Sequence, residues 1–145
     1  MEIAYRLLAV RMRSRRELAE RLQRRGIPDG IVNDLLAQLS QRGLIDDTKF
    51  AQAWVRGRQA PRPSGAVRLR YELTRKGVSR EIIDRAIAAV MEEQGDSEFE
   101  VARAVARDRG DRYRGLPRQV ADRRLSAYLQ RRGFSADVIA RVLRT

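Results

Sequence analysis

One pattern of apolar and basic positions occurs three times along the chain. In each copy, two leucines four residues apart are followed by a basic pair, a glycine and an apolar residue. The glycines are Gly26, Gly77 and Gly133, which lie 51 and 56 residues apart. The leucine pairs are Leu18 with Leu22, Leu69 with Leu73, and Leu125 with Leu129. Self-similarity on this scale predicts a helical repeat array.

Each copy predicts a helix, a glycine turn and a second helix. Leucines four residues apart share one face of a helix. Basic side chains in the last turn favour the carbonyl end of that helix, and glycine then adopts the left-handed capping conformation. The apolar residues Ile27, Val78 and Phe134 are expected to fold back on the helix end. The second helix begins at Pro28 with Asp29, at Ser79 and at Ser135.

A further helix is expected before each copy, at about residues 3–12, 47–58 and 97–109. Ser14 and Glu17 form a capping-box pattern before the first copy, and Asp46 or Asp47 is the expected N-cap of the helix at 47–58. A magnesium site normally needs more oxygen ligands than this acidic pair supplies. Phe50 and Trp54 lie four residues apart, and we predict both in the core.

These elements predict an all-α protein, an elongated and curved array of three tandem three-helix repeats. Repeat 1 covers residues 1–58, repeat 2 covers 65–109 with the preceding helix 47–58, and repeat 3 covers 97–145. Linkers are expected at 59–64, where two prolines occur, and at 110–116, before Pro117 in the first turn of a helix. Single units of this size bury too little apolar surface alone, so neighbours must stack. A compact nine-helix globule is the alternative.

The charge is strongly positive and concentrated at the two ends. The net charge is +12 and the isoelectric point is near 11.3. Residues 1–58 carry 12 basic and 7 acidic side chains, residues 59–110 carry 10 and 9, and residues 111–145 carry 9 and 3. A polyanionic partner is therefore expected to contact the ends more than the middle.

The composition disfavours an enzyme. The chain has no cysteine and no histidine, so it lacks a thiol nucleophile, a sulfur ligand and the commonest general base and metal ligand. It also lacks a glycine-rich phosphate loop and a nucleophile elbow. We expect no catalytic site, no cofactor and no bound metal. No apolar run approaches the roughly 20 residues of a membrane span, and the amino terminus has no signal-peptide core, so a cytoplasmic location without membrane contact is expected.

Several short motifs resemble the RecX family. They are Ser14-Arg15-Arg16-Glu17-Leu18, Gly43-Leu44-Ile45-Asp46-Asp47 with Phe50-Ala51 and Trp54-Val55, Glu72-Leu73 with Lys76-Gly77-Val78, and Arg132-Gly133-Phe134. The resemblance covers about residues 3–145. It implies a regulator that binds in the groove of the RecA recombinase filament on single-stranded DNA and limits filament growth, ATP hydrolysis and strand exchange. The residues that the resemblance marks as structural are Ser14, Glu17, Leu18, Gly26, Asp46, Asp47, Phe50, Trp54, Gly77 and Gly133.

Arginines and two tyrosines are the candidate contact residues for the filament or its DNA. The candidates are Arg15, Arg16, Arg24, Arg25, Tyr71, Arg75, Lys76, Arg123, Arg124, Tyr128, Arg131 and Arg132. The arginines either form a phosphate-binding face or lie on solvated faces beside carboxylates. Tyr71 and Tyr128 share repeat columns with charged residues, so both are expected to be exposed, either stacking on bases or lying over a neighbouring helix. A monomer is expected, and an autonomous nucleic-acid-binding protein is the alternative function.

Overall fold

The computed structural model describes residues 1–59 and 63–145, and this part of the chain contains helices and no strand. The helices are α1 (Glu2–Val10), α2 (Arg15–Arg24), α3 (Asp29–Gln41), α4 (Asp47–Gln59), α5 (Ala66–Arg75), α6 (Arg80–Gln94), α7 (Glu98–Gly110), the 3-10 turn η1 (Asp111–Tyr113), α8 (Arg118–Arg131) and α9 (Ala136–Leu143).

The α-helices form three groups of three, and each group encloses its own hydrophobic core. Leu18 and Leu22 lie in the core of α1–α3, Leu69 and Leu73 in that of α4–α6, and Leu129 in that of α7–α9. The side chain of α6 residue Met91 packs against both the second and the third core. Each repeat therefore buries its own apolar face, and the junctions between repeats are left largely to polar contacts.

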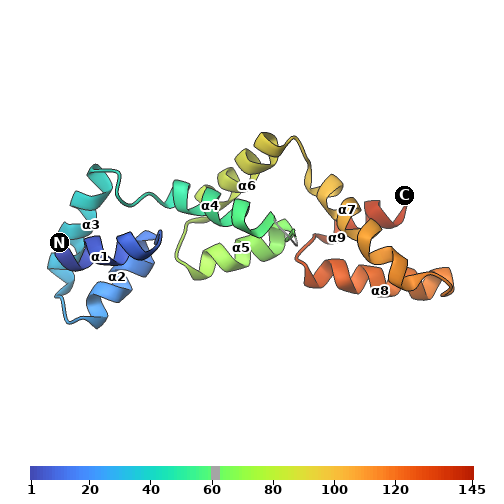
Figure 1. Cartoon of the computed structure of the whole chain (residues 1–145), viewed down its shortest axis with the longest axis horizontal. Helices are drawn as coiled ribbons and strands as arrows, with labels where there is room; N and C mark the ends of the chain where they lie inside the picture. The colour runs from blue at the N-terminus through green and yellow to red at the C-terminus, as the bar shows by residue number, and fades with distance from the viewer. Residues whose placement is uncertain (60–62) are drawn as a thin grey trace.

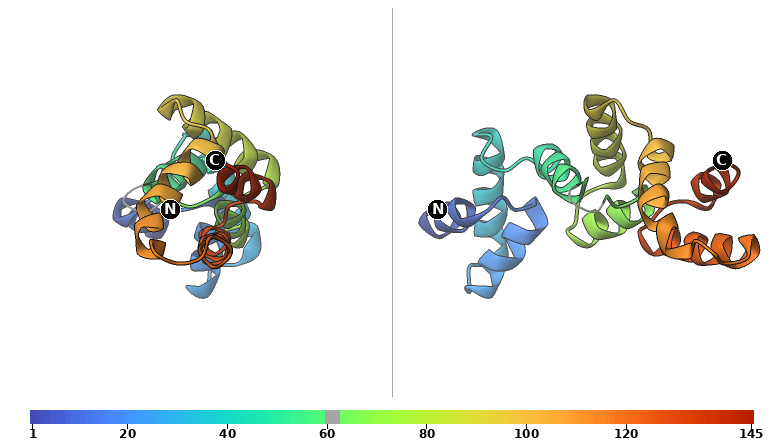
Figure 2. Two further views of the ribbon diagram at one scale, coloured as in Figure 1. Left: turned by 90° about the vertical axis from the view of Figure 1, so that its right-hand side faces the viewer. Right: turned by 45° about the vertical axis from the view of Figure 1, so that its right-hand side comes forward.

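The three repeats follow one another in an elongated, gently curved array, with the two termini at opposite ends (Figures 1 and 2). Helices α2, α5 and α8 lie along one edge, which is the lower edge in Figure 1, and the carboxyl end of α6 rises from the other. The predicted fold class is confirmed, and the compact globule is excluded.

The local signals at the helix ends act as predicted. Gly26, Gly77 and Gly133 have φ angles of 82°, 82° and 91°, which is the left-handed region that favours glycine. The N–H groups that follow each glycine donate to carbonyls of the helix just ended: Ile27 to Leu22, Val78 to Leu73 and Phe134 to Leu129. Ser14 and Glu17 form the predicted capping box, and Ser79 and Ser135 are N-caps of α6 and α9.

The second linker is shorter than predicted. Gly110 is the last residue of α7 and has a helical φ of −58°, and residues 111–113 continue as η1. Glycine permits the left-handed conformation without requiring it, so the prediction that 110–116 is a non-helical linker is wrong for its first four residues. Pro117 is the N-cap of α8. In the first linker, Gln59 ends α4, residues 60–62 lie outside the described residues, and Pro63 and Ser64 lead into α5.

Phe50 is in the core as predicted, whereas Trp54 is at its edge. Phe50 is buried, and the Trp54 ring, stacked on it with centroids 6.3 Å apart, is only partly buried. The Lys76 ammonium and the Arg58 guanidinium lie 4.6 and 4.9 Å from the Trp54 ring centroid. The indole N–H donates to a Glu72 carboxylate oxygen at 3.3 Å. The prediction of a core position for Trp54 is wrong, because cations rather than apolar groups cover part of the ring.

Candidate nucleic-acid interface

Helices α2, α5 and α8 are arranged head to tail along one edge of the molecule. The amino end of α2 meets the carboxyl end of α5, and the amino end of α5 meets the carboxyl end of α8 (Figure 1). The last carbonyls of a helix have no partner within it, and the first N–H groups likewise have none. Joining unlike ends satisfies both sets and places the positive end of one helix dipole against the negative end of the next.

At the first junction, N-terminal groups of α2 donate to the last carbonyls of α5. The Ser14 hydroxyl donates to the Lys76 carbonyl oxygen at 2.6 Å, and an Arg16 guanidinium N–H donates to that of Arg75 at 2.8 Å. The Lys76 ammonium also donates to a Glu17 carboxylate oxygen at 3.2 Å. The two residues that precede the capping glycine Gly77 therefore connect the first and second repeats.

The second junction repeats this arrangement with different residues. The Gly65 N–H donates to the Arg132 carbonyl oxygen at 2.7 Å, and the Val67 N–H donates to that of Gly133 at 2.9 Å. An Arg132 guanidinium N–H donates to the Pro63 carbonyl oxygen at 3.0 Å. The N-cap residue of one helix, Ser14 or Gly65, thus contacts the residue just before the capping glycine of the next.

A carboxylate from the next repeat completes the N-terminus of α2 and of α5. Asp47, the first residue of α4, accepts a bond from the Arg15 N–H at 2.8 Å. Glu98, the first residue of α7, accepts one from the Ala66 N–H at 3.4 Å. Asp46 caps α4 itself by accepting from the N–H groups of Thr48 and Lys49. Asp46 is therefore the N-cap predicted for α4, whereas Asp47 caps α2, a helix of the preceding repeat, which was not predicted.

Glu17 is the charged centre of the first junction. Burial raises its pKa, but hydrogen bonds from the Arg11 guanidinium, the Ser14 N–H and the Lys76 ammonium outweigh burial and hold the pKa below its ordinary value. Its carboxylate lies 3.1 Å from an Arg11 nitrogen and 3.2 Å from the Lys76 nitrogen. The ionised form of Glu17 therefore stabilises the junction.

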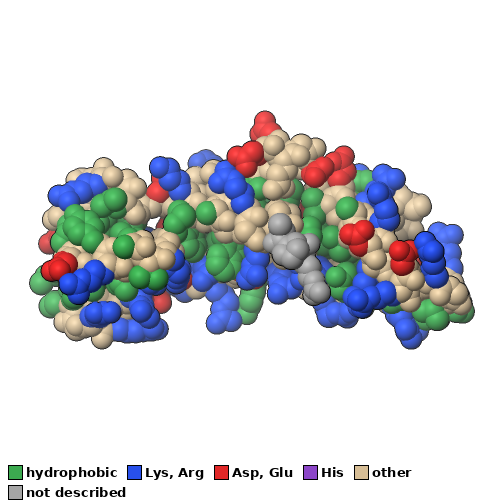
Figure 3. Space-filling model, in the orientation of Figure 1, with side chains coloured by type: hydrophobic (Ala, Val, Ile, Leu, Met, Phe, Trp, Pro, Cys, Tyr) green, Lys and Arg blue, Asp and Glu red, His purple; other side chains and the backbone are tan. Residues whose placement is uncertain are grey.

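The head-to-tail helices carry a continuous basic edge. With the residue that follows each of them, α2, α5 and α8 have 14 basic and 4 acidic side chains. In Figure 3, Lys and Arg side chains occur along much of the lower edge as well as near the top, and Asp and Glu side chains lie at the highest part of the molecule and at scattered positions elsewhere. The sequence predicted basic ends and a nearly neutral middle, yet the middle segment, residues 59–110, is nearly neutral only because seven of its nine acidic residues lie on α6 and α7. The helix that it contributes to the edge is basic.

The candidate residues divide into an exposed group and a junction group. The exposed arginines are Arg15, Arg16, Arg24, Arg25, Arg75, Arg123, Arg124 and Arg131. Lys76 and Arg132 are half-buried and engaged at the two junctions. Lys76 and Arg132 hold neighbouring repeats together, and Arg16 belongs to both groups, since its exposed side chain also donates to the Arg75 carbonyl oxygen across the first junction.

The two tyrosines differ in exposure. Tyr71 is 61% exposed on α5, as predicted, and the Arg75 guanidinium lies over its ring at 5.7 Å. Tyr128 is partly buried, and the Arg109 guanidinium of α7 lies 4.2 Å from its ring centroid. The prediction that Tyr128 is exposed is wrong, because α7 of the same repeat covers one side of its ring, and the equivalent Glu72 in the second repeat is partly buried as well.

The described residues contain no cluster of acidic side chains able to hold a metal ion. None of their helices has the length and apolar character needed to cross a membrane.

Arg109 was not among the residues that the sequence marked as candidates, since its contact with Tyr128 depends on the packing of α7 against α8.

Three family models match the chain in order. The first three-helix domain of RecX matches residues 1–39, the second matches 46–87 and the third matches 96–143. The chain belongs to the RecX family. The matched segments correspond to the three helical groups of the structure, and each ends within the last helix of its group.

Curated RecX relatives and solved RecX structures agree with this assignment. The regulatory protein RecX of Chlorobium phaeobacteroides is 42% identical over 87 residues, which is 60% of this chain and 58% of that protein. The RecX of Amycolatopsis mediterranei is 38% identical over 74% of this chain and 60% of that protein. The matches therefore span somewhat more than half the length of these relatives.

Two crystal structures have the same fold. RecX from Lactobacillus salivarius superposes with a TM-score of 0.88 at 21% identity, over 99% of this chain and 91% of that one. A second structure, of regulatory protein RecX, gives a TM-score of 0.81 at 26% identity, over 97% of this chain and 69% of that one. The elongated arrangement of three repeats is therefore shared with solved RecX proteins.

Proposed function

We propose that this chain regulates the RecA recombinase by binding the RecA filament on single-stranded DNA, where it limits filament extension, ATP hydrolysis and strand exchange. Membership of a family of regulatory proteins supports a regulatory role. The observation that carries the proposal is the basic edge formed by α2, α5 and α8, which continues through both junctions.

The geometry of the array suits an extended polyanionic partner. A nucleoprotein filament is long and repetitive, and an elongated chain of repeats joined by hydrogen bonds can contact it at several points. Arginine binds phosphates and carboxylates bidentately, so the exposed arginines suit both the DNA backbone and an acidic protein surface. The absence of histidine and cysteine fits a protein that acts by binding rather than by chemistry.

Comparison of three binding targets tests the proposal. The labelled chain is titrated with RecA filaments on single-stranded DNA, with bare single-stranded DNA, and with RecA without DNA, all at physiological salt. The proposal expects binding to the filament to be at least about tenfold tighter than to either component. Equal affinity for the filament and for bare DNA, with the steep salt dependence of phosphate contacts, would favour an autonomous nucleic-acid-binding protein.

A further inference from the structure

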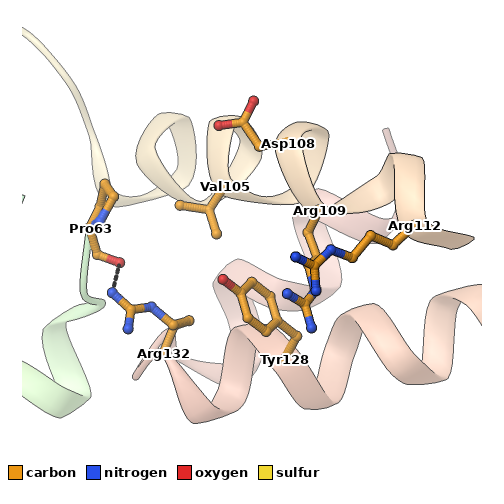
Figure 4. A pocket seen from close by; sticks show the side chains of 7 residues that line it. All are labelled: Pro63, Val105, Asp108, Arg109, Arg112, Tyr128 and Arg132. Atoms are coloured by element: carbon orange, nitrogen blue, oxygen red, sulfur yellow. Dashed lines mark hydrogen bonds between the residues drawn. The ribbon is translucent and has the colours of Figure 1, made fainter. Parts of the chain in front are cut away.

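A hollow lined by three arginines lies between α7 and α8 (Figure 4). Its volume is about 250 Å³, compared with about 30 Å³ for a water molecule in the liquid, so it has room for a phosphate group. The residues that line it are Pro63, Val105, Asp108, Arg109, Arg112, Tyr128 and Arg132. Three guanidinium groups and a phenol hydroxyl provide an unusual density of hydrogen-bond donors for one surface hollow.

Arg109 is positioned by two aromatic side chains rather than by a carboxylate. The Arg109 guanidinium lies 4.2 Å from the centroid of the Tyr128 ring, and its Nε donates to the Tyr113 hydroxyl at 3.4 Å. Arg132 donates to the Pro63 carbonyl oxygen. Within the described residues, neither Arg109 nor Arg112 forms an ion pair with a carboxylate.

Figure 4 shows how these side chains lie. Arg109 and Arg112 descend from α7 and η1 beside the Tyr128 ring, the Tyr128 hydroxyl points into the hollow, and Arg132 lies on the opposite side. Asp108 is the acidic residue of the lining, and its carboxylate points away from the guanidiniums. The hollow is therefore lined by positively charged hydrogen-bond donors. An anion with several acceptor oxygens requires such an environment.

We propose that this hollow binds a backbone phosphate of a single-stranded nucleic acid, with Arg109 and Arg112 as phosphate ligands and the Tyr128 hydroxyl as a further donor. Its position favours a strand as the source of the phosphate. The turns of α8 on either side of Tyr128 carry the exposed Arg124 and Arg131 of the basic edge, so a strand that follows this edge passes the mouth of the hollow. The assignment rests on the proposed function, since it names the site at which the DNA of the filament is held.

A charge-matched pair of double variants tests the site. Arg109→Gln with Arg112→Gln removes two charges from the hollow. Arg103→Gln with Arg107→Gln removes two charges from exposed positions of α7 outside it. Binding of a fluorescent oligo(dT) strand is measured by anisotropy at several salt concentrations. Thermal unfolding of each variant is followed by circular dichroism, and only variants that are folded at the temperature of the binding measurement are compared.

The hollow double variant is expected to bind at least about tenfold more weakly, and its salt slope is expected to fall by about 0.7 for each phosphate that it no longer neutralises. The control double variant is expected to lose no more than about threefold in affinity, because it lowers the overall positive charge of the protein without removing a phosphate ligand. Tyr128→Phe, which keeps the ring under Arg109 and removes the hydroxyl, is expected to weaken binding about threefold to tenfold. Equal reductions in affinity in the two double variants would overturn the assignment.

A second arm distinguishes the strand from a free nucleotide. ATP replaces the oligonucleotide as the ligand for the same variants. Loss of ATP binding in the hollow double variant, with oligonucleotide binding unchanged, would overturn the strand assignment. If the two double variants weaken oligonucleotide binding equally while the unaltered chain still inhibits RecA, the hollow fails and the proposed function stands. If the unaltered chain leaves RecA unaffected, and of the two double variants only the hollow variant fails to bind the strand, the proposed function fails and the phosphate site stands.

Discussion

The hydroxyl of Ser14 donates a 2.6 Å hydrogen bond to the carbonyl oxygen of Lys76, a residue 62 positions further along the chain. Ser14 also accepts from the N–H of Glu17 within its own helix. One side chain therefore begins α2 and completes the end of α5. This double role explains how a thin array of small repeats keeps its helices in line without a shared core at the first junction.

The capping glycines differ in what surrounds them, which predicts unequal costs of the same substitution. A Cβ atom at Gly77 would lie 2.5 Å from the Cβ of Arg16, and one at Gly133 would lie 2.6 Å from the backbone nitrogen of Arg68. A Cβ at Gly26 meets no atom within 4 Å, although its φ is the same as that of Gly77.

Gly26→Ala should therefore cost about 1–2 kcal/mol, the strain of a left-handed alanine alone. Gly133→Ala should cost at least about 2 kcal/mol more, because backbone of α5 must move as well. Urea unfolding of the two variants measures the difference. Equal free energies of unfolding would show that the second junction does not depend on the close approach of α5 to Gly133.

The position of Trp54 at the edge of the core predicts a moderate loss of stability on truncation. Trp54→Ala should cost about 2–3 kcal/mol, less than the roughly 3–5 kcal/mol typical of a fully buried ring. Trp54 is the one tryptophan in the sequence, so its fluorescence reports the first junction directly. Lys76→Met should change the emission of the folded protein, because the ammonium lies 4.6 Å from the ring. An unchanged spectrum would mean that the contact does not form in solution.

Glu17 predicts a pH dependence of stability. Its folded pKa is lower than its unfolded value of about 4.3, so the stabilisation is complete above that value and is lost as the pH falls through the folded pKa. Glu17→Gln should therefore destabilise the protein by about 1–3 kcal/mol at about pH 7 and by much less at about pH 2.5. Chemical unfolding at the two pH values measures this. A penalty of equal size at both would contradict a role for the ionised carboxylate.

The basic edge predicts which arginines matter for filament binding. Arg123→Gln with Arg124→Gln alters two exposed residues of α8, and should reduce affinity for RecA–DNA filaments by about tenfold with little change in stability. Arg80→Gln with Arg85→Gln on α6 removes the same charge away from the edge and should reduce affinity by no more than about threefold. Arg132 is a poor choice for this test, because its half-buried guanidinium holds the second junction. Equal reductions in the two double variants would refute a role for the edge.

The sequence predicted the features that depend on neighbouring residues. The glycine caps, the capping box of Ser14 and Glu17 and the serine N-caps are local, so their residue types and spacing determine them. The bond from Ser14 to Lys76 and the contact of Arg132 with Pro63 join positions 62 and 69 residues apart. No local pattern indicates such pairs.

Comparison of repeat columns failed at Tyr128 for a related reason. Equivalent positions in the three repeats do not have equivalent surroundings. Arg109 comes from the last turn of α7, a helix that runs on through Gly110 into η1. The packing of α7 against α8 brings the Arg109 guanidinium over the ring, and η1 adds the Tyr113 hydroxyl that accepts from it. The sequence motif of the third repeat does not show the hollow beside this ring.

The most direct test of the proposed regulation is the ATP hydrolysis of RecA on single-stranded DNA, measured while this protein is added at far less than one molecule per recombinase. We predict inhibition at such low ratios, because a regulator bound to a growing filament stops the addition of many RecA molecules. The variant Arg123→Gln with Arg124→Gln should require about tenfold more protein for the same effect. Inhibition that begins only when the DNA itself is saturated would contradict the proposed regulation and indicate simple competition for the strand.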